Sequence, residues 1–164
     1  MIKADVKING LAVIKFNRKL RQVLPRLVKK QLKRSSFFAL GEIKKRTLSG
    51  LDFRRRRFHP YAPSTGRGRK ENIGTVDLKD TGQMLGSMNF NSKGNFRTQL
   101  GFRNNDANRK AFYHDVAGAG KSKIRREFFS IDRQTEEKLT TIFSREIERS
   151  IGLLWVKEKI LLVI

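Results

Sequence analysis

The stretch Gly118–Ser122, GAGKS, resembles the end of a phosphate-binding P-loop. That motif needs an earlier glycine, five residues before the glycine that precedes the lysine, so that backbone amides can surround phosphate oxygens. The earlier position here is Asp115, whose carboxylate would repel a phosphate. The residues before it also fit a helix better than the buried strand that the motif requires. We therefore interpret this stretch as a flexible basic loop and expect no nucleotide cofactor.

A metal-dependent nuclease is the second chemistry that the residues could supply. Such an enzyme needs two or three carboxylates that converge on Mg²⁺. No Asp-x-Asp or Glu-x-Lys cluster lies on a convincing pair of strands, and helix capping explains three of the carboxylates without any chemistry. The carboxylates considered are Asp77, Asp80, Asp106, Asp115, Glu127 and Asp132, of which Asp80, Asp106 and Asp132 suit cap positions.

The remaining residues do not favour a nucleophilic enzyme or a metal site. The chain has no cysteine, which excludes disulfides, thiolate zinc sites and cysteine nucleophiles. Its two histidines, His59 and His114, have no acid or nucleophile near them in the sequence, so packing or surface roles are favoured. We expect no catalytic residue, no metal and no cofactor, and predict that the protein is not an enzyme. No apolar run approaches membrane-spanning length, so we also expect no membrane partner.

Charge is distributed very unevenly along the 164 residues. Residues 1–70 hold 21 Lys and Arg against 3 Asp and Glu, whereas residues 71–164 hold 16 against 12, which together give the formal net charge of +22. So many like charges repel one another and oppose compaction unless a partner supplies counter-charge. The sequence therefore predicts a polyanion, an acidic protein surface, or both as partners.

Two basic segments are candidate partner or DNA contacts. The first is one face of the N-terminal helical region, and the second is an arginine run with aromatic residues around it, a mixture that suits a nucleic-acid backbone. Pairing of the run with acidic residues of a neighbouring subunit explains it equally well. The residues are Lys29, Lys30, Lys33 and Arg34 in the first segment and Arg54, Arg55, Arg56 and Arg57 in the second.

The N-terminal half contains helical periodicity followed by a long loop. Residues Ile2–Ile8 alternate polar and apolar, which predicts a short strand, and apolar residues then recur at helical spacing up to Leu48. Pro25 interrupts this pattern, so the region is either one bent helix or a helical hairpin. From Leu51 to Thr75 the chain has no apolar periodicity, which predicts an extended basic loop.

Alternating strands and helix caps characterise the C-terminal half. The pattern predicts a short helix within Asp77–Met88, strands at Met88–Asn91 and Phe96–Phe102 with a turn at Gly94, and a helix capped by Asp106. Arg126–Ile131 fits a strand or an extended segment. Ser130 or Asp132 then caps a final helix.

These elements predict an α+β fold, in which N-terminal helices and a C-terminal helix pack on a small antiparallel sheet with a long basic loop. We expect one domain over residues 1–152, with the loop at 51–75. Residues 153–164 are apolar for a tail, and such an exposed strip usually docks on a neighbour.

Three stretches, in order, are similar to one protein family. They are Ile43–Tyr61 (IKKRTLSGLDFRRRRFHPY), Val76–Phe90 (VDLKDTGQMLGSMNF) with a strand ending LGF at residues 100–102, and Ala111–Asp132 (AFYHDVAGAGKSKIRREFFSID). Their order resembles the tail-completion and neck proteins of tailed bacteriophages, the virion-morphogenesis family typified by Mu-like phages. The chain departs from the family pattern at Glu127, where proline is usual, and in its more basic arginine run.

The resemblance implies a structural virion protein of the head–tail junction, made in the host cytoplasm. It would form a homo-oligomeric ring, most simply a hexamer, that completes or caps the tail and joins it to the head connector. Implied partners are other copies of the chain, the connector or adaptor, the tail tube or tail terminator proteins, and the DNA in the channel. Thr81 and Gly82 would set the short helix, while Arg125, Arg126, Phe128 and Phe129 would anchor a packing corner. The alternative from the residues themselves is a general basic nucleic-acid-binding protein.

Overall fold

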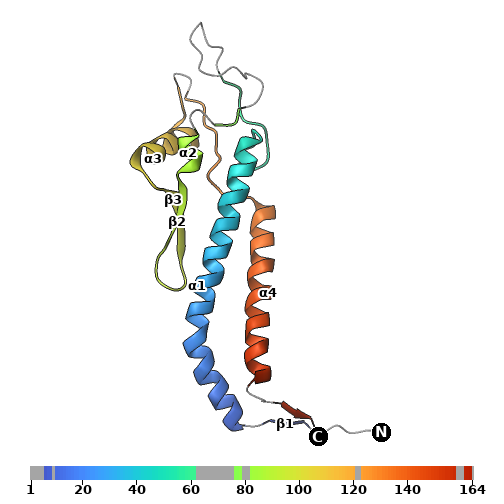
Figure 1. Cartoon of the computed structure of the whole chain (residues 1–164). Helices are drawn as coiled ribbons and strands as arrows, with labels where there is room; N and C mark the ends of the chain where they lie inside the picture. The colour runs from blue at the N-terminus through green and yellow to red at the C-terminus, as the bar shows by residue number, and fades with distance from the viewer. Residues whose placement is uncertain are drawn as a thin grey trace, which may run out of the picture.

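The computed structural model describes residues 6–8, 10–61, 76–78, 82–120, 123–157 and 161–163. It has an α+β fold dominated by two long helices, with a small head at one end (Figure 1). The elements are β1 (Val6–Ile8), α1 (Gly10–Leu48), α2 (Gln83–Gly86), β2 (Met88–Ser92), β3 (Thr98–Phe102), α3 (Asn105–Phe112), the π-helical turn η1 (Tyr113–Ala117), α4 (Arg133–Lys157) and β4 (Leu161–Val163). The predicted fold class is confirmed.

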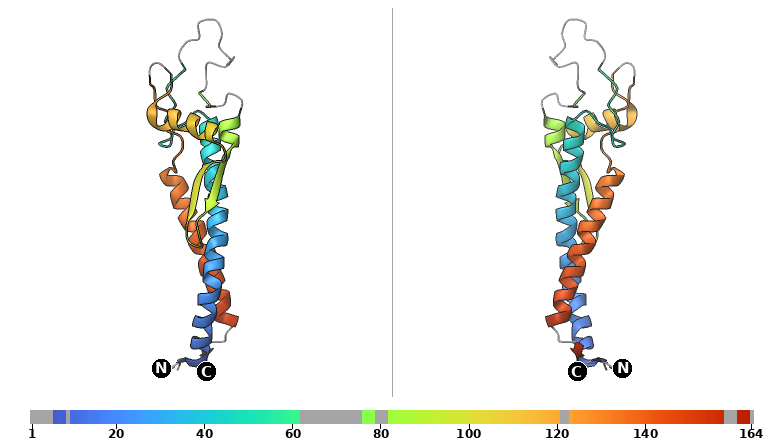
Figure 2. Two further views of the ribbon diagram at one scale, coloured as in Figure 1. Left: turned by 90° about the vertical axis from the view of Figure 1, so that its left-hand side faces the viewer. Right: turned by 90° about the vertical axis from the view of Figure 1, so that its right-hand side faces the viewer.

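The α1–α4 pair forms an antiparallel rod. Figures 1 and 2 show α4 lying along α1 from the head to the far end. Helix α1 has 39 residues, a length of about 58 Å at 1.5 Å per residue. A compact globule of 164 residues has a diameter of only roughly 40 Å. The rod therefore extends well beyond the core of the head.

Helix α1 runs through Pro25 without a break in its assignment. The helical-hairpin interpretation of this region is therefore wrong, and the single-helix interpretation is confirmed. Proline removes one amide donor from a helix interior and clashes with the preceding turn, which bends or breaks most helices. Here packing continues on both sides of Pro25: Ala12 and Phe16 are buried on its N-terminal side and Gln31 on its C-terminal side.

The head is built on the C-terminal half of α1. Strands β2 and β3 form a hairpin in the register Met88↔Phe102 to Ser92↔Thr98, and Gly94 has φ 75° in the turn as predicted. The inner face of the hairpin packs on α1, with Phe37 and Phe90 in edge-to-face contact at 4.7 Å. The buried core consists of Leu40, Ile43, Phe58, Val76, Leu78, Met84, Leu85, Met88, Ala111 and Phe128.

A second, much smaller cluster lies near the far end of the rod. Ala12 and Phe16 are buried there against Ile151 and Leu154, and Phe16 meets Trp155 edge-to-face at 5.0 Å. Beyond it, β1 pairs antiparallel with β4, so a segment near the start of the chain lies beside one near its end (Figure 1). The expected separate tail, 153–164, thus begins as the last turns of α4 and ends in a strand paired within the chain. Its docking on a neighbour stays a prediction.

Three local expectations are refined by the structure. Within the described residues of the predicted helix at 77–88, the helix is Gln83–Gly86, and Leu78 (φ 51°) and Gly82 (φ 77°) lie outside helical backbone geometry. Asn104, not Asp106, caps α3, and its side-chain oxygen accepts a hydrogen bond from the Ala107 amide at 2.7 Å. Of the two caps predicted for α4, Ser130 and Asp132, the structure has Asp132, whose side chain accepts a hydrogen bond from the Thr135 amide at 3.0 Å.

Candidate interaction surfaces

A buried ion pair joins the two long helices where they enter the head. Arg46, in the last turn of α1, donates from Nη1 to Asp132 Oδ2 at 2.8 Å. Its Nη2 donates to the carbonyls of Phe128 and Ser130, each at 2.7 Å. Both side chains are almost fully buried, at 4% and 6% exposure. Arg46 therefore fixes the whole segment that leads into α4.

Asp132 accepts more hydrogen bonds than those from Arg46. Its carboxylate also accepts from the Thr135 amide at 3.0 Å, from the Thr135 hydroxyl at 2.9 Å and from Arg55 at 3.2 Å. Burial by itself raises the pKa of this carboxyl, but the bonds from Thr135, Arg46 and Arg55 outweigh it and lower the pKa to about 2. Asp132 is thus a charged structural centre.

The arginine run is partly neutralised within the chain. Asp52 Oδ1 accepts from the backbone amides of Arg54 and Arg56, each at 2.8 Å, and its Oδ2 accepts from Arg56 Nε at 3.0 Å. Arg55 has φ 62°, and its side chain contacts Asp132. Arg54 lies over the Phe53 ring at 4.9 Å, while Arg57 is exposed. Two of the four predicted contact arginines therefore already have a carboxylate partner in their own chain.

The corner predicted around Arg126 joins two segments of the head, residues 59–61 and 126–128. Arg126 is buried, donates to the carbonyls of His59 and Pro60, each at 3.1 Å, and lies over the Tyr61 ring at 5.0 Å. Phe128 is fully buried in the core. By contrast, Arg125 is exposed and forms a surface pair with Glu127 at 3.0 Å.

Asp115 has a structural role in the same corner. Its Oδ1 accepts from the backbone amides of Phe128 and Phe129, at 2.7 and 2.9 Å. Gly118, with φ 86°, packs so closely on Lys123 that an added Cβ would collide with the Lys123 carbonyl. These contacts favour a structural explanation of the P-loop-like stretch, although Lys121 and Ser122 lie outside the described residues. Thr81 also lies outside them, and Gly82, with φ 77°, directly precedes α2.

The first predicted basic set lies on the rod, away from the arginine run; it consists of Lys29, Lys30, Lys33 and Arg34 of α1. Lys30 and Lys33 are exposed and Lys29 is half-buried. Arg34 approaches Glu146 of α4 at 3.9 Å, with 60% of its side chain exposed. From Arg34 to Leu48 the helix rises about 21 Å, so the two predicted basic sets do not form one patch. They are separate surfaces of the molecule.

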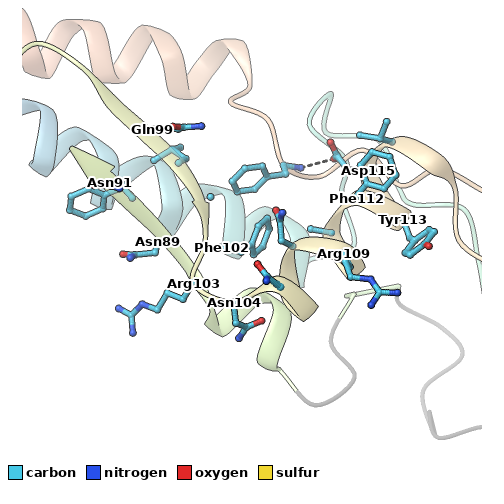
Figure 3. Close-up of a pocket in the computed structure, with 18 residues that line it drawn as sticks. Asn89, Asn91, Gln99, Phe102, Arg103, Asn104, Arg109, Phe112, Tyr113 and Asp115 are labelled. Atoms are coloured by element: carbon cyan, nitrogen blue, oxygen red, sulfur yellow. Dashed lines mark hydrogen bonds between the residues drawn. The ribbon is translucent and has the colours of Figure 1, made fainter. Parts of the chain in front are cut away.

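Sequence reasoning missed a groove between the hairpin and α3 with η1 (Figure 3). It is a hollow of about 870 Å³ with carboxamide, guanidinium and aromatic side chains in its walls. Its polar and aromatic lining comprises Asn89, Phe90, Asn91, Gln99, Phe102, Arg103, Asn104, Asn105, Asn108, Arg109, Phe112, Tyr113, Asp115 and Phe129. The available signal was the alternation of Asn89 and Asn91 with apolar residues in a predicted strand.

Within the part of the chain that the structure describes, no group of three or more His, Asp or Glu side chains could hold a metal ion. No helix of that part is long and apolar enough to cross a membrane. Comparison of the chain with protein-family models, with curated protein sequences and with solved structures finds no match.

The low pKa of Asp132 predicts a specific loss of stability in acid. The folded-state value of about 2 lies below the ordinary 3.8. The stabilisation, about 2 kcal/mol, is therefore fully present above the ordinary value and disappears as the pH falls toward 2. Asp132→Asn should abolish this contribution, so its free energy of unfolding should fall less than that of the parent between pH 5 and pH 2. Urea denaturation at a series of pH values measures it.

The exposed first-turn carboxylate of α3 provides the control, since Asp106→Asn leaves Asp132 intact and should retain the acid dependence of the parent. Equal acid sensitivity in Asp132→Asn and the parent would contradict the assignment.

Removal of Arg46 should be among the most destabilising changes in the chain. Arg46→Met leaves the buried Asp132 carboxylate without its main counter-charge, a change that costs roughly 3–5 kcal/mol. The double variant Arg46→Met/Asp132→Asn should lose less than the sum of the two single variants, because the remaining group is no longer a lone buried charge. Denaturant unfolding of all four proteins gives the coupling energy.

A matched control is Arg133→Met, which breaks a surface pair with Glu137 at 91% and 63% side-chain exposure. It should change stability by less than about 0.5 kcal/mol. Strict additivity of the Arg46 and Asp132 substitutions would show that the pair is not the link between the helices.

Proposed function

We propose that this chain is a non-enzymatic structural subunit of a phage head–tail neck, which forms a closed ring that completes the tail and joins it to the head connector. The sequence resemblance suggests this role. The observation that supports it in the structure is the α1–α4 rod, which extends beyond the core and leaves large apolar side chains uncovered.

The exposed apolar residues of the rod are numerous for a single subunit. At its far end Leu11 is 73% exposed, Leu153 65% and Val156 74%. Few side chains are buried in this part of the molecule, where Ala12 and Phe16 form the small cluster against α4. Leu153 and Val156 are three residues apart and share one face of α4. Exposed apolar side chains grouped in this way favour a protein–protein contact. A ring gives each subunit two neighbours that can cover it.

The charge of the rod also favours a partner. Helix α1 contains 12 Lys and Arg and one Glu, whereas α4 contains 5 Lys and Arg and 4 Glu. Helix α4 therefore cannot neutralise α1. Counter-charge has to come from acidic neighbours or from DNA, both of which a neck would provide. The exposed Lys30 and Lys33 are the α1 residues that we expect to meet it.

A second candidate function is a general nucleic-acid-binding protein, which the same excess of Lys and Arg on α1 favours. A salt titration with a 20-base-pair duplex separates the two. We expect no duplex binding by the isolated protein near 150 mM salt, together with cosedimentation with tails or connectors. Tight duplex binding there, with a steep decrease of log K against log salt, would favour the second candidate over the neck role.

Assembly should depend on the apolar end of the rod. Leu153→Glu/Val156→Glu places two carboxylates on exposed positions and should abolish ring formation, because charges are excluded from the centre of protein interfaces. The monomer should stay folded, since neither side chain belongs to the buried clusters. Light scattering after gel filtration measures the oligomer, and circular dichroism measures the melting temperature.

Ser144→Glu is the matched control, because it adds a carboxylate at an exposed position in the middle of α4. It should assemble as the parent does. A monomeric parent protein, or a parent ring that tolerates the double substitution, would argue against this interface. Cryo-electron microscopy of intact particles then tests the neck assignment itself.

A further inference from the structure

The β2–β3 hairpin contributes a row of polar side chains to the groove. The register of the hairpin places Asn89 opposite Gly101 and Asn91 opposite Gln99, so these four residues share one face. Phe90 and Leu100, on the other face, pack against the core and also form part of the groove lining. The carboxamides therefore lie on the face opposite Phe90 and Leu100, and the space beside Gly101 is open, because an added Cβ there would meet nothing within 4 Å.

Helix α3 and the π-helical turn η1 form the opposite wall. Phe112 and Tyr113, which lie where α3 passes into η1, are 54% and 50% exposed, with their ring centroids 6.1 Å apart. Figure 3 shows both rings, together with Arg109, on the side of the groove across from Asn89 and Asn91. Single π-helical turns are frequent at functional sites. Large aromatic rings left half exposed beside polar side chains are not explained by the packing of this chain.

The charges in the groove favour an anionic ligand. Arg103 and Arg109 line it, and both are exposed. Asp115 is the acidic residue in its lining, and one of its carboxylate oxygens already accepts hydrogen bonds from the Phe128 and Phe129 amides. The formal charge of +22 on the whole chain would attract a polyanion from a distance.

We propose that this groove binds single-stranded nucleic acid. Phe112 and Tyr113 would stack on unpaired bases, Arg103 and Arg109 would contact phosphates, and the carboxamides of Asn89, Asn91 and Gln99 would hydrogen-bond base edges. Base stacking on aromatic side chains tolerates any sequence. A duplex is disfavoured because its bases are already stacked on one another. This site goes beyond the neck role, which does not require it.

Fluorescence anisotropy with labelled dT20 tests the site on the full-length protein, with U20 to distinguish DNA from RNA. Phe112→Ala/Tyr113→Ala should weaken dT20 binding by at least about tenfold, since each stacked base contributes substantially. Arg103→Ala/Arg109→Ala should reduce the slope of log K against log salt by about 1.4, because each phosphate contact on a single strand contributes roughly 0.7. A 20-base-pair duplex is the competing ligand.

Phe96→Ala is the matched control, because Phe96 is 64% exposed in the hairpin turn, at the other end of the hairpin from α3. It should bind dT20 as the parent does, and melting temperatures should show that all variants are folded. Parent-like dT20 affinity in Phe112→Ala/Tyr113→Ala, or a parent that prefers the duplex, would overturn the proposal. Neither result affects the assembly role, which is measured by ring formation.

Discussion

The contact between Arg46 and Asp132 holds the two halves of this molecule in register. It connects the last turn of α1 to the cap of α4, and the same guanidinium binds two carbonyls of the segment between them. A buried pair of this kind contributes little net stability compared with an apolar replacement, but breaking one side of it is costly. The contribution of the Arg46–Asp132 pair is therefore to geometry. The crossing of α1 and α4, the position of Phe128 in the core and the path of the arginine run all depend on this pair.

The Asp132 carboxylate also changes how the arginine run is interpreted, because it pairs with Arg55 as well as with Arg46. Four successive arginines in a sequence suggest a uniformly cationic loop. In the structure, however, Asp52 accepts hydrogen bonds from two backbone amides of the run and pairs with the Arg56 side chain. Asp132 pairs with Arg55. These contacts order residues 51–61, so that the loop presents Arg54 and Arg57 outward from a fixed backbone. A preorganised pair of cations loses less entropy on binding an acidic partner than a flexible tetrad.

Local patterns predicted much of the fold, and long-range pairing accounts for what they missed. The β2–β3 hairpin follows from alternation and Gly94, and the cap of α4 follows from Asp132, because each signal lies within a few residues. Arg46 and Asp132 are 86 positions apart, and nothing near Arg46 marks it as the buried residue among twelve basic residues in α1. The β1–β4 pairing and the groove similarly bring together segments that no periodicity relates. Helix continuity at Pro25 was undecidable for the same reason, since contacts along the rod determine it.

The rod and the groove are suited to different kinds of ligand. The Lys and Arg residues of α1 lie on a helix that has exposed apolar residues near its end. This combination favours extended contact with neighbouring subunits and their acidic groups. In the groove two arginines accompany carboxamides and half-exposed rings in a concave site, where stacking and hydrogen bonding add to charge. The affinity of a partner for the rod should therefore depend mainly on buried area and on charge. The affinity of a ligand for the groove should instead include a contribution from stacking and hydrogen bonding that remains at high salt concentration. The residual binding at high salt is the property that distinguishes a shaped site from a basic surface.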